Sequence, residues 1–455
     1  MPTAYTILFL LLILVAAATW IIPAGSYDYV DGVPVAGTYH AVAQNPQGVG
    51  DVLKAAFSGF YDAVDVCIFI LMVGGFLGVV MKTGAVDAGV ANVIRLLGGR
   101  EKWLIPILML LFGLGGTTYG MWEETMAFYP LLIPVFLAAG YDAVVGISVI
   151  LLGAGAGVIA STVNPFATGI AAGFAGVSLG EGIVLRLLEW VAFEAAAIWF
   201  VMAYAARIKR NPSKSVVGVG AGKIQVTMDQ QVPFTAKRKV IMAFFTLTFL
   251  IMVYAVVPFD EMGLPLPTLG WWFPELSALF LAAGVVIGLI DRMGEEELVE
   301  TYVAGCADLL GVAFIIGISR GITVLMRDGA ITDTILHWGE AALSGAGAVS
   351  FTLLVFVLYL PLTILIPSSS GLATLSIPIV APLGKFAGVG GDLVVTAFQS
   401  ASGLVNILTP TAAVVMGALA LGHVPYDRWV KYVWKLMLWF LLLALVFLVA
   451  GVLLG

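Results

Sequence analysis

Four clusters of hydroxyl, amide and carboxyl side chains interrupt the apolar stretches of this 455-residue sequence. Two clusters lie in the first half, at residues 117–125 and 161–168, and two lie in the second half, at residues 368–370 and 400–411. Polar groups inside hydrocarbon-rich sequence are costly unless they line a cavity or a water-filled path. We therefore predict one binding site for a small polar solute or an ion, built by Thr117, Thr118, Glu123, Glu124, Thr125, Ser161, Thr162, Asn164, Thr168, Ser368, Ser369, Ser370, Ser400, Ser402, Asn406, Thr409 and Thr411.

The adjacent carboxyl groups of Glu123 and Glu124 carry the strongest chemical signal in these clusters. Carboxylates inside a membrane require a cation, which here is a proton, Na⁺ or a cationic substrate. Successive residues of a helix point about 100° apart, so we expect only one of the two to face a ligand. The serines at 368–370 have no acidic neighbour, so charge recognition is expected to be asymmetric. The alternative, that both acids are solvated at a turn that reaches water, stays open.

Proline interrupts two long apolar segments directly beside these polar residues. Pro165 follows Asn164, and Pro410 follows Thr409. Because proline removes a backbone donor and clashes with the preceding turn, each segment is expected to be a broken helix. The ends of a broken helix expose carbonyl oxygens that suit Na⁺ and amide groups that suit carboxylates. Asn164 and Asn406 form the candidate Na⁺ site. The alternative for the serines and threonines of the four clusters is that each hydroxyl only satisfies a carbonyl of its own helix.

The composition is that of a polytopic membrane protein. Of all residues, 61% are hydrophobic and 11% are charged, and the mean hydropathy is +1.06. A soluble domain carries about 25% charged residues. The two cysteines and three histidines lie far apart in the sequence, so we expect no disulfide and no metal cofactor. Segment 218–223 resembles a phosphate-binding loop but lacks its spacing and its Ser or Thr, so we expect no nucleotide-driven motor.

The positions of lysine and arginine predict the orientation of the chain in the membrane. We interpret residues 4–23 as the first transmembrane helix rather than as a cleavable signal peptide. Residues 24–53 contain no lysine or arginine and are expected outside, whereas residues 207–239 contain eight and are expected in the cytoplasm. The N-terminus is therefore expected in the cytoplasm and the C-terminus outside, with the chain in the inner membrane of the cell.

The two halves of the chain resemble each other. Met81-Lys82-Thr83-Gly84-Ala85 matches Met326-Arg327-Asp328-Gly329-Ala330, and Pro165 matches Pro410, each at an offset of 245 residues. Because the halves are expected to enter the membrane from opposite faces, the repeat is inverted. We predict a first helix and outer loop at 1–50, repeat 1 at 51–206, a basic linker with two connecting helices at 207–290, and repeat 2 at 291–455. Single spans are expected at 64–82 in repeat 1, at about 239–257 and 273–290 after the linker, and at about 433–453 at the end of repeat 2.

Each repeat is predicted to contain a re-entrant helical hairpin and a broken helix. The hairpins are expected at 103–139 and 350–387, because their apolar arms are too short to span a bilayer and meet at a polar tip. The broken helices are expected at 143–176 and 392–421. The fold class is thus an all-α polytopic membrane protein with about 11 transmembrane segments, and such inverted repeats are typical of secondary transporters.

Three further ionisable residues lie inside apolar segments. Arg320 lies near the end of a helix predicted at 304–325, and we favour snorkelling of its guanidinium to the surface over a contact with a substrate or a glutamate. Glu189 and Glu194 lie in the apolar run 183–205, where they are expected to pair between helices or to approach the surface. Neither glutamate has an assigned role.

Several motifs of the chain resemble the YfcC-type carriers. They are Ile22-Pro23-Ala24-Gly25, Gly115-Gly116-Thr117-Thr118-Tyr119-Gly120 with Glu123-Glu124-Thr125, Ser161-Thr162-Val163-Asn164-Pro165, and residues 406–411. These carriers belong with the anaerobic C4-dicarboxylate carriers (DcuC) and the basic amino acid antiporters, in the ion transporter superfamily. The resemblance covers essentially the whole chain. It implies an elevator-type homodimer with a scaffold and a moving transport domain.

The resemblance also implies what such a protein transports. Structurally known relatives carry Ser-Asn-Thr at both hairpin tips and couple to Na⁺, whereas this chain has two glutamates near its first tip and three serines at its second. Acidic tip residues repel a dianion and suit arginine or ornithine. We therefore expect a secondary active transporter of a small, basic amino acid, working by antiport or with H⁺ or Na⁺ as coupling ion. A carrier of C4-dicarboxylates or other organic anions is the alternative; a channel, an enzyme activity and a nucleic-acid partner are not expected.

Overall fold

The chain folds almost entirely into helices. The computed structural model describes residues 4–31, 33–86, 88–89, 92, 100–118, 120–178, 180–217, 233–256, 259 and 265–454, so the phosphate-loop-like segment at 218–223 lies outside the described residues. The described residues contain 17 α-helices and four strands of two residues each, β1 (Gly25–Ser26), β2 (Tyr29–Val30), β3 (Val33–Pro34) and β4 (His40–Ala41). The predicted helical class is confirmed. The label all-α is corrected by two small antiparallel sheets, β1–β4 and β2–β3, because the backbone of this loop finds its hydrogen-bond partners within the loop.

Six helices form one bundle around the long helix α12. They are α1 (Ala4–Ala18), α2 (Val49–Asp62), α3 (Val64–Lys82), α10 (Ala236–Val256), α11 (Phe273–Asp291) and α12 (Glu295–Asp328). Gly74 and Gly78 of α3 face Gly305 of α12, and a Cβ added at Gly305 would lie 3.0 Å from the Gly78 Cα. Small residues at such a contact allow the backbones of two apolar helices to touch.

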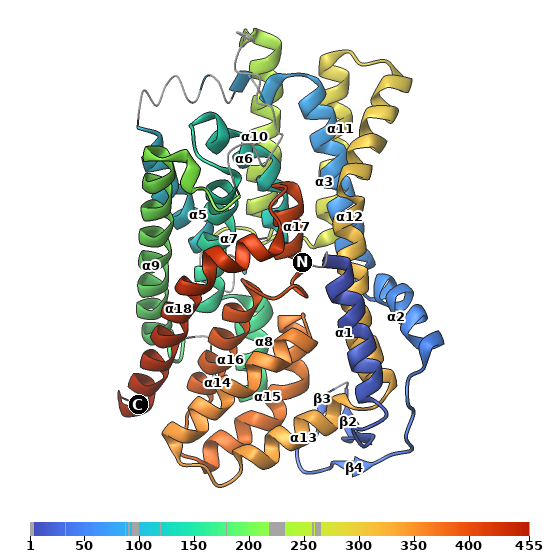
Figure 1. Ribbon diagram of the computed structural model, residues 1–455, viewed down its shortest axis with the longest axis vertical. Helices are drawn as coiled ribbons and strands as arrows, with labels where there is room; N and C mark the ends of the chain where they lie inside the picture. The colour runs from blue at the N-terminus through green and yellow to red at the C-terminus, as the bar shows by residue number, and fades with distance from the viewer. Residues whose placement is uncertain are drawn as a thin grey trace.

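A second group of helices packs around α7 and α16. It comprises α5 (Leu104–Thr118), α6 (Tyr129–Ala138), α7 (Ala143–Ile159), α8 (Ile170–Ala175), α9 (Ile183–Arg210), α14 (Ala348–Leu365), α15 (Ser369–Phe386), α16 (Gly391–Asn406) and α18 (Tyr426–Leu454). Every residue of α7 is buried, so this helix is the core of the group. Figure 1 shows α5, α9 and α18 on the left and α1, α3 and α12 on the right. The short helix α17 (Ala413–Leu421) contacts α12 on one side and α7 on the other, which joins the two groups.

Helices end at each of the four polar clusters. The first pair, α5 and α6, is separated by the 3₁₀ helix η2 (Glu123–Phe128), and the second pair, α14 and α15, is separated by residues 366–368. α7 ends at Ile159, and helical structure resumes only at Pro165–Gly169, a single π-helical turn that leads into α8. α16 ends at Asn406, and α17 begins at Ala413 after Pro410. The proline-induced breaks therefore lie close to the polar residues that form the candidate site.

Two helices of the described chain were absent from the predicted element order. One is α2, which precedes α3, and the other is α13 (Thr332–Leu343), which packs against α15, α14 and strand β1. α13 holds the loop between α1 and α2: Asp333 accepts hydrogen bonds from the Tyr27 backbone N–H at 3.0 Å and from the Tyr29 hydroxyl at 2.8 Å. Both helices are shorter and less apolar than a transmembrane span, so the hydropathy pattern does not distinguish them from loop.

Five described helices are long and apolar enough to cross a membrane: α3, α11, α12, α14 and α18. α12 begins at Glu295 and not near residue 304, because three glutamates occupy its first turn, where the helix dipole favours them. α18 likewise begins at Tyr426 and not near residue 433. The multi-pass character of the chain is established by these helices, whereas the total of about 11 segments stays a prediction.

Candidate functional site

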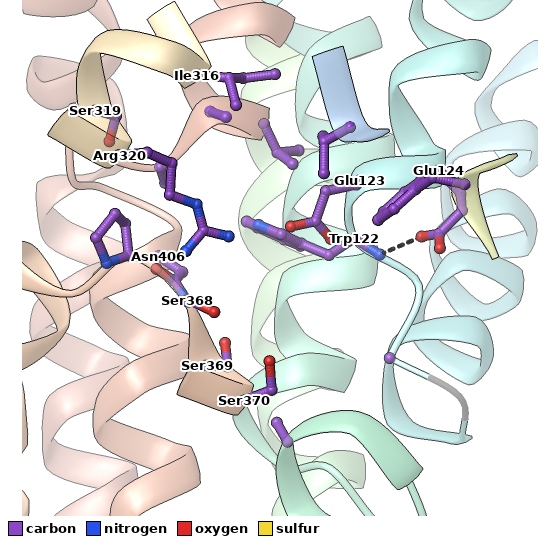
Figure 2. A pocket seen from close by; sticks show the side chains of 18 of the residues that line it. Trp122, Glu123, Glu124, Ile316, Ser319, Arg320, Ser368, Ser369, Ser370 and Asn406 are labelled. Carbon is purple, nitrogen blue, oxygen red and sulfur yellow. Dashed lines mark hydrogen bonds between the residues drawn. The ribbon is translucent and has the colours of Figure 1, made fainter. Parts of the chain in front are cut away.

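A cavity of about 210 Å³ lies between the two helix groups. One wall comes from α2, α3, α11 and α12, and the other comes from the segment before η2, the break after α7, the start of α15 and the break between α16 and α17. Figure 2 shows the Arg320 guanidinium of the first wall directed toward Trp122 and Glu123 of the second. Two separate groups of helices thus bring their polar residues together at a single place.

The segment between α5 and α6 contributes Gly120, Trp122, Glu123 and Glu124 to the cavity. The Glu124 carboxylate is 5% exposed and accepts a hydrogen bond from the Trp122 backbone N–H at 3.1 Å. Glu123 is less buried and lies within electrostatic range of Arg320 and Asp65. In Figure 2 Glu123 lies on the side of Arg320, whereas the Glu124 carboxylate turns back to the Trp122 backbone N–H. Glu123 is therefore the glutamate that faces the opposite wall.

The start of α15 contributes Ser368, Ser369 and Ser370. Ser368 caps this helix, because its hydroxyl accepts a hydrogen bond from the Gly371 N–H at 3.3 Å. The N-terminus of a helix carries unpaired N–H groups and partial positive charge, which favour an anion. The cavity therefore has one helix N-terminus with three serine hydroxyls in its wall.

The two helix breaks contribute Asn164, Asn406 and Thr411. Asn164 lies against Gly120, whose positive φ of 78° and lack of a Cβ allow this close approach. Ser319 of α12 donates a hydrogen bond to the Thr411 carbonyl at 2.7 Å and so joins the α16–α17 break to the first group of helices. Both asparagines of the candidate Na⁺ site line the cavity and offer neutral oxygens.

Arg320 corrects the expectation from sequence. It lies in the middle of the cavity wall rather than snorkelling to the surface, and in Figure 2 its guanidinium points into the cavity between Asn406 and Trp122. The reason is that α12 continues for two turns beyond Arg320 and keeps it away from the helix end. An arginine inside an apolar helix was the available signal, since intramembrane charges usually serve a binding site.

Asp62 and Asp65 also line the cavity, and sequence analysis missed both. They lie at the junction of α2 and α3; the sequence predicted no helix between residues 51 and 63 and gave Asp65, in the helix expected at 64–82, no role. With Glu123 and Glu124, the lining residues include four carboxyl groups and a single guanidinium, that of Arg320. The cavity therefore presents both signs of charge, with an excess of acid.

Nine of the predicted site residues do not line the cavity. Hydrogen bonds to neighbouring groups in the protein occupy the hydroxyls of Thr117, Thr118, Thr125, Thr162, Ser400 and Thr409. The hydroxyls of Ser161, Thr168 and Ser402 are buried and have no hydrogen-bond partner within the described residues. The structure thus separates cavity residues from those that hold the helix ends together.

No group of three or more His, Cys, Asp and Glu side chains with metal-site geometry occurs in the part of the chain that the structure describes. The chemistry of the cavity is instead that of ionic recognition. Arg320 and the α15 N-terminus suit a carboxylate, whereas Glu123 with Asp65 suits an ammonium or guanidinium group. A molecule that carries both kinds of charge complements this arrangement.

Comparison with known proteins assigns a family to this architecture. The family model described as the C4-dicarboxylate anaerobic carrier, DcuC, matches residues 1–453. An uncharacterised protein of Haemophilus influenzae is 35% identical over 503 residues, which cover 99% of this chain and 97% of that protein. YfcC of Escherichia coli, whose name proposes a basic amino acid antiporter, is 30% identical over 480 residues, which cover 95% of this chain and 92% of that protein. The solved structure of MtrF from Neisseria gonorrhoeae covers 98% of this chain and 94% of its own, with 17% identity and a TM-score of 0.46.

Long apolar helices around a charged cavity are typical of a multi-pass membrane transporter. This chain belongs to the C4-dicarboxylate anaerobic carrier (DcuC) family, which confirms the resemblance seen in its motifs.

Proposed function

We propose that this protein is a secondary active transporter of a small, basic amino acid such as arginine or ornithine. The observation that carries the proposal is the charge of the cavity, whose lining contains four carboxyl groups and one guanidinium. A basic amino acid has one carboxylate and two cationic groups. Its carboxylate matches the guanidinium of the cavity, and its cationic groups match the more numerous carboxyl groups. The relative YfcC, named for basic amino acid antiport, supports the same reading.

The cavity residues then have separate roles. Arg320 and the α15 N-terminus bind the substrate carboxylate, and the serines at 368–370 add hydroxyl donors. Glu123, with Asp65, binds the cationic side chain. If Na⁺ is the coupling ion, Asn164 and Asn406 provide neutral oxygens for it. The alternatives within the same proposal are coupling to H⁺ and direct exchange of one substrate for another.

The proposed movement is of the elevator type, in the inner membrane and within a homodimer. The cavity lies between one bundle of long helices and a second group that contains both helix pairs and both breaks. Movement of the second group against the first carries the substrate from one face of the membrane to the other. α17 and the Ser319–Thr411 hydrogen bond are contacts that this movement has to break.

A C4-dicarboxylate or another organic anion is the second candidate substrate. Arg320 and the α15 N-terminus favour it, and the family description names this substrate class. Binding of a dianion in this cavity requires that the surrounding carboxyl groups be protonated or occupied by cations, because like charges repel at this range.

Counterflow in proteoliposomes tests the proposal. Vesicles are loaded with unlabelled arginine, labelled arginine is added outside, and no ion gradient is applied; succinate is the parallel substrate. We expect labelled arginine to accumulate transiently in vesicles that contain the protein and not in protein-free vesicles. Accumulation of succinate alone would refute the amino acid proposal and favour the second candidate.

A further inference from the structure

Helix α9 carries two buried carboxyl groups that do not line the cavity. Glu189 is 0% exposed and Glu194 is 2% exposed, in the middle of an apolar helix. Neither oxygen of the Glu194 carboxyl group, and only one oxygen of Glu189, has a hydrogen-bond partner within the described residues. A buried carboxyl without partners is rare because its charged form loses hydration without compensation.

The charges near Glu189 are partly balanced. The Ser400 hydroxyl of α16 donates a hydrogen bond to Glu189 Oε1 at 2.8 Å. Arg186, one turn earlier on α9, interacts electrostatically with Asp392 of α16 and with Glu189. One guanidinium therefore serves two carboxyl groups at this end of the helix, and no charge is left over for Glu194.

Within the described residues, the main elements packed against α9 bring no cation to Glu194. They are α5, α7, α18 and the 3₁₀ helix η4 (Pro212–Lys214), with α16 reaching α9 through Ser400. α5 and α7 contain no ionisable side chain, and α16 has only Asp392. The ring of Phe193 lies 4.8 Å from that of Phe440, so Glu194 is level with a part of α18 beyond its last ionisable residue, Lys435.

The remaining charged and titratable groups on these elements have other positions or partners. Asp427 pairs with Arg428 and Lys431, Lys209 pairs with Glu101, and Tyr204 and Tyr432 form hydrogen bonds with Asp142 and Ser148. Lys214 is exposed beyond the end of α9, where Arg207 and Arg210 occupy the last turn and are exposed. Hence Glu194 is buried between helices, with no charged neighbour among the described residues.

The position of Glu194 connects it to the cavity. Its carboxyl group lies against Gly113 of α5, and a Cβ at Gly113 would lie 2.9 Å from the Glu194 Cδ. One turn further, Thr117 of α5 is hydrogen-bonded to the break after α7, just before the segment that holds Glu123. Through Glu189 and Ser400 the same helix also contacts α16, whose last residue, Asn406, lines the cavity.

We infer that Glu194 is the binding site for a coupling proton. The carboxyl group holds the proton while α5 covers it, and both helices travel together in the second group. It exchanges the proton with water when α5 shifts against α9 within that group during transport. The proton enters from water on one side of the membrane and returns to water on the other side, so no further reactant is required. This inference rests on the proposed transport function, and it assigns the H⁺ form of its coupling to one residue.

The test compares Glu194→Gln with the wild type and with Glu181→Gln in proteoliposomes. Gln is isosteric with a protonated Glu but cannot exchange a proton, and Glu181 is an exposed glutamate just before the same helix. We expect Glu194→Gln to keep arginine counterflow at equal pH within about twofold, and to lose about tenfold or more of the arginine accumulation that a pH gradient drives. Glu181→Gln is expected to behave as the wild type in both assays.

Undiminished pH-driven accumulation in Glu194→Gln would overturn the inference while leaving the transport function intact. Glu194→Asp, which keeps an acid one methylene shorter, serves if Glu194→Gln does not fold; we expect a shifted pH profile of coupled transport, and an unchanged profile would overturn the inference. If wild-type counterflow fails, the proposed function fails. The infrared C=O band of a protonated carboxylic acid then tests the protonation of Glu194 independently of transport. We expect the band in the wild type and in Glu181→Gln, and a weaker band in Glu194→Gln.

Discussion

Replacement of Thr117 by valine tests whether this hydroxyl holds the end of α5 to the break after α7. The Thr117 hydroxyl donates to the Ala160 carbonyl at 2.8 Å and accepts from the Thr162 N–H at 3.1 Å. Thr162 N–H keeps a second acceptor in the variant, the Thr117 carbonyl at 2.8 Å. The Ala160 carbonyl, at the end of α7, has no second hydrogen bond among those described.

The expected cost follows from this difference. One buried acceptor left without a partner costs about 1–3 kcal/mol, which is a factor of about 5 to 150 in the ratio of folded to unfolded protein. Thr118→Val is the matched control, because the Thr118 hydroxyl only donates to the Leu114 carbonyl of its own helix. Its replacement should change the free energy of unfolding by no more than about 0.5 kcal/mol.

Thermal unfolding in detergent, followed by tryptophan fluorescence, measures both variants. We expect a clearly lower Tm for Thr117→Val and an almost unchanged Tm for Thr118→Val. Arginine counterflow should show a raised KM only in Thr117→Val, because Trp122 and Glu123 follow the displaced end of α5. Equal shifts in the two variants would refute the assignment of a tethering role to Thr117.

Three further changes test the cavity and the loop between α1 and α2. Glu123→Gln should lower arginine counterflow about tenfold or more, because a charge-assisted hydrogen bond contributes about 1.5–3 kcal/mol; rates at saturating and limiting arginine measure the change. Arg320→Lys should raise the KM for any transported carboxylate about tenfold, because an ammonium group cannot form two parallel hydrogen bonds; concentration dependence of uptake measures it. Asp333→Ala should speed amide hydrogen exchange at residues 25–30 about tenfold, because Tyr27 and Tyr29 lose their common acceptor; mass spectrometry of peptides from this loop measures it.

Each of these results has a clear opposite. Unchanged counterflow in Glu123→Gln would remove this carboxylate from substrate binding. An unchanged KM in Arg320→Lys would show that the guanidinium does not contact the substrate. Unchanged exchange in Asp333→Ala would mean that the sheets alone, and not α13, hold the loop.

The membrane-spanning helices were the most predictable part of the fold. The span expected at 64–82 coincides with α3 (Val64–Lys82), and the one expected at 273–290 is α11 (Phe273–Asp291). A long apolar segment has few alternatives to a helix, because each backbone polar group needs a partner inside the segment. The predictions failed for α2 and α13, since helices of mixed polarity are stabilised by packing against α12 or α15 rather than by their own hydropathy.

The local chemistry of the site was also visible in the sequence. Polar residues beside prolines predicted where the helices end, and Glu123, Asn164 and Asn406 were named before the cavity was known. The breaks are local events because proline affects only its own turn and the preceding one. The orientation in the membrane, the elevator movement and the homodimer remain predictions.

By itself, the sequence determined that this protein is a helical, multi-pass membrane protein with polar breaks in matching places, because those properties depend on hydropathy and on the local effects of proline and glycine. Only the tertiary structure decided which polar residues share the cavity. It brought Asp62, Asp65 and Arg320 to face Glu123, and it separated Thr117 from the cavity as a tether. The reason is that the face a helix turns toward a gap depends on its packing against helices far away in the sequence, and no local pattern contains that information.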